Sequence, residues 1–247
     1  MKENDSRGRS PHRNFQLSTF SFQPLNTAVP ILAFILTALE AYLLGSIPTG
    51  YLAARARGVD IRTVGSGNIG ATNALRVLGK PTGVFVLLMD ALKGWLACHL
   101  AVYIYSAVAS GTTHSLSDAS GRMEDCAILA GIFAVLGHNY TCWLRFKGGK
   151  GIATSAGVYL ALAPWALLVA VLVFILALLA TRYVSVGSIT AAIALPAAVW
   201  ILPPHNLLLG IVTTALGLLA ICKHKGNIQR LIAGTENRLQ FKKKEVT

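Results

Sequence analysis

Long apolar stretches alternate with short polar segments along this chain. Seven stretches are predicted to be membrane helices, at residues 31–54, 81–109, 125–144, 152–163, 164–180, 186–202 and 206–222. A helix needs about 20 apolar residues to cross the hydrocarbon core of a bilayer, and only the stretch at 152–163 is much shorter. The pattern therefore predicts an all-α integral membrane protein, a bundle of about seven transmembrane helices.

The same stretches allow a second interpretation. If 152–180 is one long tilted helix and 186–222 is another, the chain has five spans. We prefer seven because Arg182 would otherwise lie on the opposite side from the other basic segments. Pro203 and Pro204 also separate the last two stretches, since proline interrupts a helix.

Composition supports a membrane protein. Of the 247 residues, 54% are hydrophobic and 13% are charged, whereas soluble domains carry about 25% charged residues. The net charge of +12 would suit nucleic acid, but the basic residues lie in short segments between spans and in the tail. Because we find no basic helix and no aromatic platform, we expect no nucleic-acid partner. The four cysteines lack metal-ligand spacing, and we expect neither a metal nor a cofactor.

Lysine and arginine are distributed unevenly between the two sides of the predicted bundle. Residues 55–80 contain five, residues 145–150 contain three and the tail from 223 contains seven, whereas the opposite loops contain only Arg122. Basic loops stay in the cytoplasm, so the N-terminus is predicted outside and the C-terminus in the cytoplasm. Four basic residues between positions 2 and 13 disagree, but they lie far from most of the first span.

The chain divides into one membrane domain and two tails. Residues 1–29 are polar and are expected to form a disordered N-terminal tail. No convincing cleavage site follows, so the first apolar stretch is expected to be a retained helix rather than a signal peptide. Residues 30–236 form the predicted transmembrane domain, and residues 237–247 form a basic C-terminal tail.

A glycine-rich segment follows the first span. Residues 65–70 fit the pattern G-x-G-x-x-G, but a dinucleotide site needs a preceding strand, and a membrane helix precedes this one. The glycines still let the backbone wrap an anion, and residues 71–78 are predicted to be a helix whose first amides face that anion. Arg76 lies one turn beyond Thr72 on the same helical face. The alternative is a flexible turn.

A second glycine-rich segment lies at residues 146–151. It is not a Walker A loop, because Gly151 rather than Ser or Thr follows Lys150. Gly148 and Gly149 before Lys150 suit an anion, whereas the alternative is a charged helix flank. His138 lies at the same end of the third span. Three roles are open for it: a general base, a phosphate donor or a hydrogen-bonded histidine at a helix end. Basic glycine loops beside apolar helices suggest an enzyme that brings a phosphorylated soluble substrate to a membrane-borne one.

Three charged residues lie inside the predicted spans. Asp90 and Lys93 are three residues apart, and intramembrane charges are costly, so a mutual pair is the leading interpretation. Glu40 has no obvious local partner.

Together and in this order, the motifs resemble the bacterial acyl-phosphate-dependent glycerol-3-phosphate acyltransferases of the membrane. Besides the two loops, they comprise residues 45–50, Arg76, Asp90, Lys93, Gly94, Gly137, His138, Ala153, Thr154, Ser185, Ser188, His224, Asn227, Arg230, Gly234, Thr235 and Glu236. The resemblance covers residues 44–236. It implies a seven-helix bundle in the bacterial inner (plasma) membrane, with its active site open to the cytoplasm.

The resemblance also assigns binding residues. Acyl phosphate would be bound by Ser66, Gly67, Asn68, Gly70, Thr72, Asn73, Gly148, Gly149 and Lys150. Glycerol 3-phosphate would be bound by Arg76, Lys150, Ser188, His224 and Asn227. The expected catalytic residues are Lys150, Arg76, His138 and Ser66, whereas Asp90 and Glu236 are expected to be structural.

The implied reaction moves a fatty acyl group from acyl phosphate to glycerol 3-phosphate, forming lysophosphatidic acid and inorganic phosphate in the first acylation of phospholipid synthesis. Acyl phosphate is an activated mixed anhydride, so no covalent enzyme intermediate is required, and positioning and charge stabilisation remain as the enzyme's main tasks. The proton acceptor is His138, His224 or a substrate phosphate oxygen, and we favour the phosphate. Expected partners are the two substrates, the lipid bilayer and the enzyme that produces acyl phosphate.

Two other functions are considered. A transporter for an organic phosphate would use the same cationic residues but needs access from both faces, whereas the polar motifs map to one side. A membrane scaffold that binds anionic lipid through its basic loops would not need the glycines of residues 65–70 and 148–149.

Overall fold

The computed structural model describes residues 28–110 and 116–239, and within them every regular element is helical. The elements are α1 Ala28–Ser46, α2 Thr49–Arg55, α3 Ala71–Leu78, α4 Lys80–Ala109, α5 Leu116–Asn139, the 3-10 helix η1 Cys142–Leu144, α6 Ile152–Leu162, α7 Pro164–Thr181, α8 Val184–Ile201, α9 Leu207–Lys223 and α10 Lys225–Ile232. The two predicted tails lie almost entirely outside the described residues.

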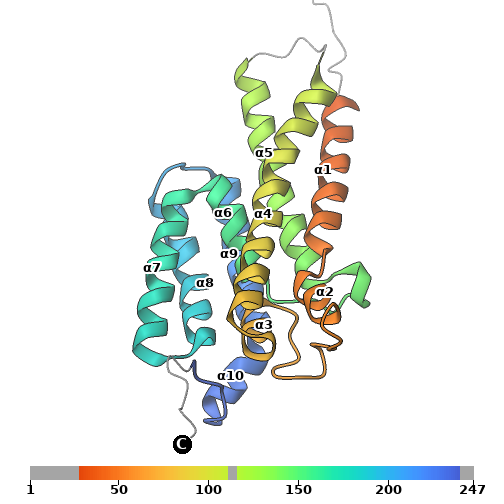
Figure 1. Ribbon diagram of the computed structural model, residues 1–247. Helices are drawn as coiled ribbons and strands as arrows, with labels where there is room; N and C mark the ends of the chain where they lie inside the picture. Colours follow the sequence, from red (N-terminus) through yellow and green to blue (C-terminus); the bar gives the residue numbers. More distant parts are fainter. Residues whose placement is uncertain (1–27, 111–115, 240–247) are drawn as a thin grey trace, which may run out of the picture.

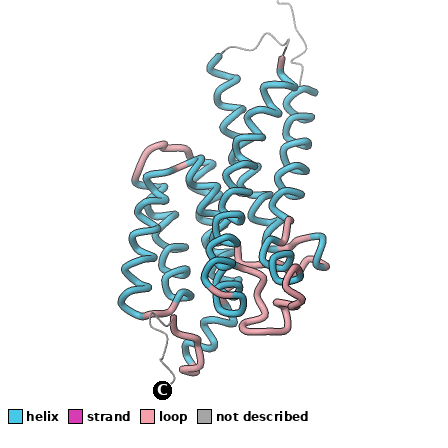
Figure 2. The backbone as a smooth tube through the Cα atoms, viewed as in Figure 1, coloured by secondary structure: helices cyan, strands magenta, loops and turns pink. Residues whose placement is uncertain are grey.

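The long helices form two groups that lie side by side (Figure 1). In the first group α4 packs against both α1 and α5, and in the second group α7, α8 and α9 pack in sequence. Helix α6 joins the groups through its contact with α4. The long loop that precedes α3 gathers at the end of the bundle where α10 lies (Figure 2), and this end is called the site end below.

All seven predicted apolar stretches contain a helix, but fewer than seven meet the usual length of a membrane span. Five described segments are long and apolar enough to cross a bilayer, and α9 with α10 makes a sixth that is bent by 51°. The two merged helices of the five-span alternative are not observed, because the chain breaks at Ala163 between α6 and α7 and at residues 202–206 between α8 and α9.

Small residues let the two groups approach closely. A Cβ atom added to Gly157 of α6 would lie 1.7 Å from the carbonyl oxygen of Ala91 in α4, and one added to Gly94 of α4 would lie 2.2 Å from that of Thr154. Membrane helices associate through such small residues because lipid and side chains are equally apolar. The α4–α6 contact therefore has no room for larger side chains at these two positions.

Helix α6 is short for a reason that concerns the site. Its 11 residues rise only about 16 Å, and the chain before it forms the loop at residues 145–151 in place of further helical turns. Gly151, which caps α6, has a φ of +79°, a left-handed conformation that glycine adopts without strain. The space left beneath α6 is where the polar motifs meet.

Candidate active site

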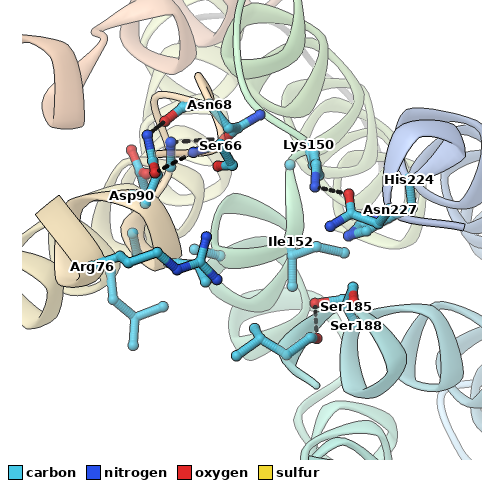
Figure 3. Close-up of a pocket in the computed structure, with 18 of the residues that line it drawn as sticks. Ser66, Asn68, Arg76, Asp90, Lys150, Ile152, Ser185, Ser188, His224 and Asn227 are labelled. Carbon is cyan, nitrogen blue, oxygen red and sulfur yellow. Dashed lines mark hydrogen bonds between the residues drawn. The ribbon is translucent and has the colours of Figure 1, made fainter. Parts of the chain in front are cut away.

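One cleft at the site end collects polar motifs from separate segments of the chain (Figure 3). Its cavity volume is about 140 Å³. The lining comprises Ser66, Asn68, Gly70, Ala71, Thr72, Asn73, Arg76, Leu87, Asp90, His138, Lys150, Gly151, Ile152, Ala153, Phe174, Val184, Ser185, Ser188, His224, Asn227, Glu236 and Asn237. Ser66 and Asn237, which are 171 positions apart in the sequence, therefore line one space.

The first glycine-rich loop is held by a single side chain. Asn73 is buried, and its amide nitrogen lies 2.9–3.2 Å from the backbone carbonyls of Ile61, Val64 and Asn68. Its side-chain oxygen accepts the N–H of Ser66 at 2.9 Å. Gly65 and Gly67 have φ values of +63° and +70°, which other residues adopt only with strain. The geometry gives Asn73 the task of shaping the loop.

Helix α3 has the bounds predicted for it, residues 71–78. The first N–H groups of a helix have no acceptor within the helix, and here they face the cleft at Ala71 and Thr72. Arg76 follows Thr72 by one turn, and its guanidinium points into the cleft (Figure 3). The first loop and α3 thus offer the helix N-terminus, the hydroxyls of Ser66 and Thr72 and the guanidinium of Arg76 to the same space.

The second glycine-rich loop differs from its predicted role. Gly148 and Gly149 do not line the cleft, and their N–H groups donate to the carbonyls of Asn139 and His138 at 3.2 and 3.0 Å. The N–H of Gly67, in the first loop, likewise donates to Val64. The N–H of Gly70 donates to the Asn68 side chain at 2.9 Å. The four glycines predicted to bind acyl phosphate therefore use their N–H groups within the protein.

These glycines instead provide clearance. A Cβ atom on Gly148 would lie 2.1 Å from the carbonyl oxygen of His138, and one on Gly149 would lie 2.1 Å from the imidazole Nε2 of the same residue. The loop therefore lies directly on the end of α5. It carries Lys150 into the cleft, while Lys147 is exposed and does not line it.

Lys150 faces the last part of the chain across the cleft. Its ammonium donates a hydrogen bond to the side-chain oxygen of Asn227 (Figure 3). Burial lowers the pKa of Lys150 to about 8, and the charges of Arg230 and Arg76 lower it too, against the opposing effect of Glu236. A bound dianion would restore the pKa, so this lysine is a strong phosphate ligand in its protonated form.

Glu236 organises the C-terminal side of the cleft. Its carboxylate accepts from the Asn227 amide at 2.8 Å and from the Arg230 Nε at 2.7 Å, and from the Ser185 hydroxyl at 3.2 Å. Burial raises the pKa of Glu236, but the hydrogen bonds from Asn227 and Arg230 outweigh burial and hold that pKa below its ordinary value. The ionised carboxylate thereby turns the Asn227 oxygen toward Lys150.

His224 and Ser188 occupy the remaining side of the cleft. The Nδ1 of buried His224 lies 2.7 Å from the Ala220 carbonyl, so Nδ1 carries the proton and Nε2 remains for a ligand. The Ser188 hydroxyl donates to the Val184 carbonyl at 2.9 Å, which leaves its oxygen free to accept. Both residues line the cleft, as predicted.

The predicted Asp90–Lys93 pair is confirmed, and it extends to His138. The Lys93 ammonium lies 2.8 Å from Oδ1 of Asp90 and donates to the Ile47 carbonyl at 2.9 Å. The same Asp90 oxygen lies 3.6 Å from Nδ1 of His138. The two nitrogens of His138 therefore face Asp90 and Gly149. Glu40, as expected, has no hydrogen-bond partner for its carboxylate among the described residues.

A second, apolar groove opens from the cleft. It is lined by Ile152, Ser155, Ala156, Tyr159, Leu167, Ala170, Val171, Phe174, Ala191, Ala192, Leu195, Thr213, Leu216, Gly217 and Ala220. Ile152 and Phe174 line both the groove and the cleft, so the two spaces adjoin. The sequence singles out none of these residues, because groove-facing and lipid-facing side chains are equally apolar.

The sequence comparisons point to one family. The family model described as glycerol-3-phosphate acyltransferase matches residues 35–234. The chain is 50% identical over 206 residues to the glycerol-3-phosphate acyltransferase of Geobacter metallireducens and 46% identical over 206 residues to that of Geobacter sulfurreducens. Each alignment covers 83% of this chain and 97% of the relative.

The solved structures agree with the sequences. The chain is similar to crystal structures of PlsY (YgiH), an integral membrane glycerol 3-phosphate acyltransferase, in a glycerol 3-phosphate form and a lysophosphatidic acid form. The TM-scores are 0.74 and 0.71, the identities are 37% and 36%, and each match covers 84% of this chain and 96% of the other. With its apolar helices, its cationic cleft and these relatives, this chain belongs to the glycerol-3-phosphate acyltransferase family of integral membrane proteins.

Proposed function

We propose that this enzyme transfers a fatty acyl group from acyl phosphate to glycerol 3-phosphate, the first acylation of phospholipid synthesis. The observation that carries the proposal is the junction of a cationic cleft with an apolar groove at Ile152 and Phe174. A phosphate, an acyl chain and a second phosphate require such neighbouring polar and apolar spaces. A transporter, the alternative considered from the sequence, is set aside because the chain belongs to an acyltransferase family.

The two sides of the cleft suit the two phosphates. The acyl-phosphate phosphoryl group would lie against the first loop, where Ser66, Thr72 and the α3 amides supply donors. Glycerol 3-phosphate would lie between Arg76 and Lys150, with His224, Asn227 and Ser188 around it. Lys150 reaches both substrates in this arrangement, which places the cation where their negative charges meet.

The reaction then needs little covalent help from the protein. A glycerol 3-phosphate hydroxyl oxygen forms a bond to the acyl carbonyl carbon, and the carbonyl–phosphate bond breaks. The phosphate leaves with the bonding electron pair and takes up the hydroxyl proton. The cations and the α3 amides stabilise the charge that develops, and holding both substrates in one cleft supplies the proximity.

His138 lines the cleft, but its Nδ1 lies 3.6 Å from Asp90 and its Nε2 lies beside Gly149. We therefore do not assign the hydroxyl proton to this side chain. We assign His138 to supporting the second loop, and the substrate phosphate remains our proton acceptor.

We also propose that the site end faces the cytoplasm of a bacterial inner membrane. Arg62, Lys147 and Lys225 are exposed at this end, whereas Arg122 lies near the start of α5 at the other. Basic residues of membrane proteins concentrate on the cytoplasmic side. This orientation puts the cleft where soluble glycerol 3-phosphate and the enzyme that makes acyl phosphate are found.

The test uses purified protein in lipid nanodiscs with labelled glycerol 3-phosphate and acyl phosphates from lauroyl to palmitoyl phosphate. Lysophosphatidate is expected from the wild type, and Lys150→Ala should lower kcat/KM roughly 100-fold because it removes charge-assisted bonds to phosphate. Lys147→Ala is the matched control, since this exposed lysine of the same loop does not line the cleft. No lysophosphatidate from folded wild type would overturn the proposal.

A further inference from the structure

The end of the apolar groove away from the cleft is lined by the buried residues Tyr159 and Thr213 and is called its closed end below. Its two ends are separated by seven residues on each of three helices, from Ile152 to Tyr159 on α6, from Phe174 to Leu167 on α7 and from Ala220 to Thr213 on α9. A helix rises 1.5 Å per residue, so each helix gives a groove depth of about 10 Å. An extended chain advances about 1.2 Å per bond, so about eight carbons fit beyond the junction.

A hydrogen-bonded pair lies at the closed end. The Tyr159 hydroxyl donates to the Thr213 hydroxyl oxygen at 2.9 Å, and Thr213 donates to the Leu209 carbonyl at 2.6 Å. Both side chains are 1% exposed, although they lie in an apolar region. Because a buried hydroxyl is costly when unpaired, the Tyr159 hydroxyl needs Thr213 as its acceptor, and this bond fixes the position of the tyrosine ring.

The turn between α6 and α7 stands directly behind this pair. Tyr159 lies one turn before Ala163, where the chain breaks, and Leu167 lies one turn after it. The N–H of Ala163 donates to the Tyr159 carbonyl, and the N–H of Leu167 donates to the Ala163 carbonyl. The backbone on both sides of the turn is therefore tied to the residues that close the groove.

We propose that Tyr159 and Thr213 form the end wall of the acyl groove and set the longest acyl chain that the enzyme accepts readily. The inference rests on the proposed function, since it takes the groove to hold the donor's acyl chain. A chain that moves from lipid to the groove exchanges one apolar environment for another, so burial alone discriminates weakly between lengths. The wall selects by steric exclusion instead.

Three single substitutions test the wall. Tyr159→Leu removes ring volume at the closed end, and Ala156→Leu adds volume to the groove one turn nearer the cleft. Tyr159→Phe is the matched control, because it keeps the ring and loses only the hydroxyl. Each purified variant is given acyl phosphates from decanoyl to stearoyl phosphate, and kcat/KM is compared across the series.

The expected results have opposite signs. Tyr159→Leu should raise the ratio of stearoyl to lauroyl activity at least about tenfold, and Ala156→Leu should lower it by a similar factor, since one methylene in a hydrophobic pocket changes kcat/KM by roughly 10- to 200-fold. Tyr159→Phe should leave the ratio unchanged. The KM for glycerol 3-phosphate should stay constant in all three, which separates a groove effect from general damage.

An unchanged ratio in folded Tyr159→Leu would overturn the proposal. If that variant does not fold, an unchanged ratio in Ala156→Leu overturns it instead. Thermal stabilisation by alkyl phosphates of increasing length gives a readout that needs no turnover. If wild type makes no lysophosphatidate but stabilisation still depends on chain length through Tyr159, the proposed function fails and the end wall stands.

Discussion

The two glycine-rich loops serve one cleft but are built in different ways. The loop at 65–70 is held mainly by Asn73, and its hydrogen bonds lie within residues 61–74. The loop at 148–150 is held by the end of α5, and its lysine is held by Asn227, 77 residues away. Gly65 and Gly67 of the first loop have positive φ values, whereas Gly148 and Gly149 of the second loop do not and instead supply clearance from the end of α5. Glycine-rich loops of similar appearance can therefore be local or dependent on the whole fold.

The largest expected effect on kcat/KM is that of Gly148→Ala, which removes the clearance between the second loop and the end of α5. The added methyl group would lie 2.1 Å from the His138 carbonyl oxygen, so the loop must lift and carry Lys150 with it. Displacement of a catalytic group by about 1 Å costs roughly 100-fold in rate, and we expect kcat/KM to fall at least that far. Steady-state kinetics with both substrates checks this.

The control for clearance is Gly121→Ala, because a Cβ atom at Gly121 would meet nothing within 4 Å. We expect this variant to keep wild-type activity. Near-normal kcat/KM in Gly148→Ala would mean that the loop tolerates a side chain, and the contrast between the two loops would fail.

The next largest effect is expected from Asn73→Ala, which removes the side chain that holds the first loop. The change removes the acceptor of the Ser66 N–H and the donor shared by three carbonyls. With about 1 kcal/mol for each of two to three net hydrogen bonds, kcat/KM should fall by roughly 30- to 100-fold. Asn68→Ala, which removes one bond to the Gly70 N–H, should cost less. Equal losses in the two variants would show that Asn73 has no special role.

The contrast also explains how far the sequence could predict the site. Residues 71–78 were predicted as a helix with the bounds observed, and Asn68, Thr72 and Arg76 do line the cleft, because the determinants of this region are local. Gly148 and Gly149 were predicted to hold a phosphate, and their N–H groups are instead used in the backbone. Nothing within residues 146–151 reveals that His138 lies beneath them.

The same argument covers the spans and the groove. Seven apolar stretches could be predicted from length and hydropathy. The role of the short helix α6 becomes clear only from its packing against α4 and α7. Phe174 and Leu195 belong to helices that are apolar on all sides, so no periodicity separates their groove face from their lipid face. Packing between distant helices decides which of these residues meet a substrate.

A smaller effect is expected from Glu236→Gln, which weakens the support that Asn227 gives to Lys150. The glutamine keeps an acceptor for one of the three donors but loses the charge that orients Asn227 and Arg230. Loss of one charge-assisted hydrogen bond costs about 1.5 kcal/mol, so the KM for glycerol 3-phosphate should rise roughly tenfold. The KM for acyl phosphate should change less, and kinetics in which each substrate is varied in turn separates the two.

A double variant sharpens this prediction. Asn73→Ala and Glu236→Gln act on different sides of the cleft, so their effects on kcat/KM should add within about 0.5 kcal/mol. A large coupling energy would show that the two loops are not independently built.

The smallest effect, absent at neutral pH, comes from the titration of Lys150. Burial lowers its pKa to about 8, so the ammonium is present below that pH and is lost as the pH rises through it. Because kcat/KM reports the free enzyme, it should fall toward tenfold per pH unit above pH 8 with glycerol 3-phosphate varied. Lys150→Arg keeps its charge at every accessible pH and should remove this decline even if its activity is lower. A decline that persists unchanged in Lys150→Arg would assign the titration to another group. The second loop would then have no pH-dependent role, and the two loops would not differ in this respect.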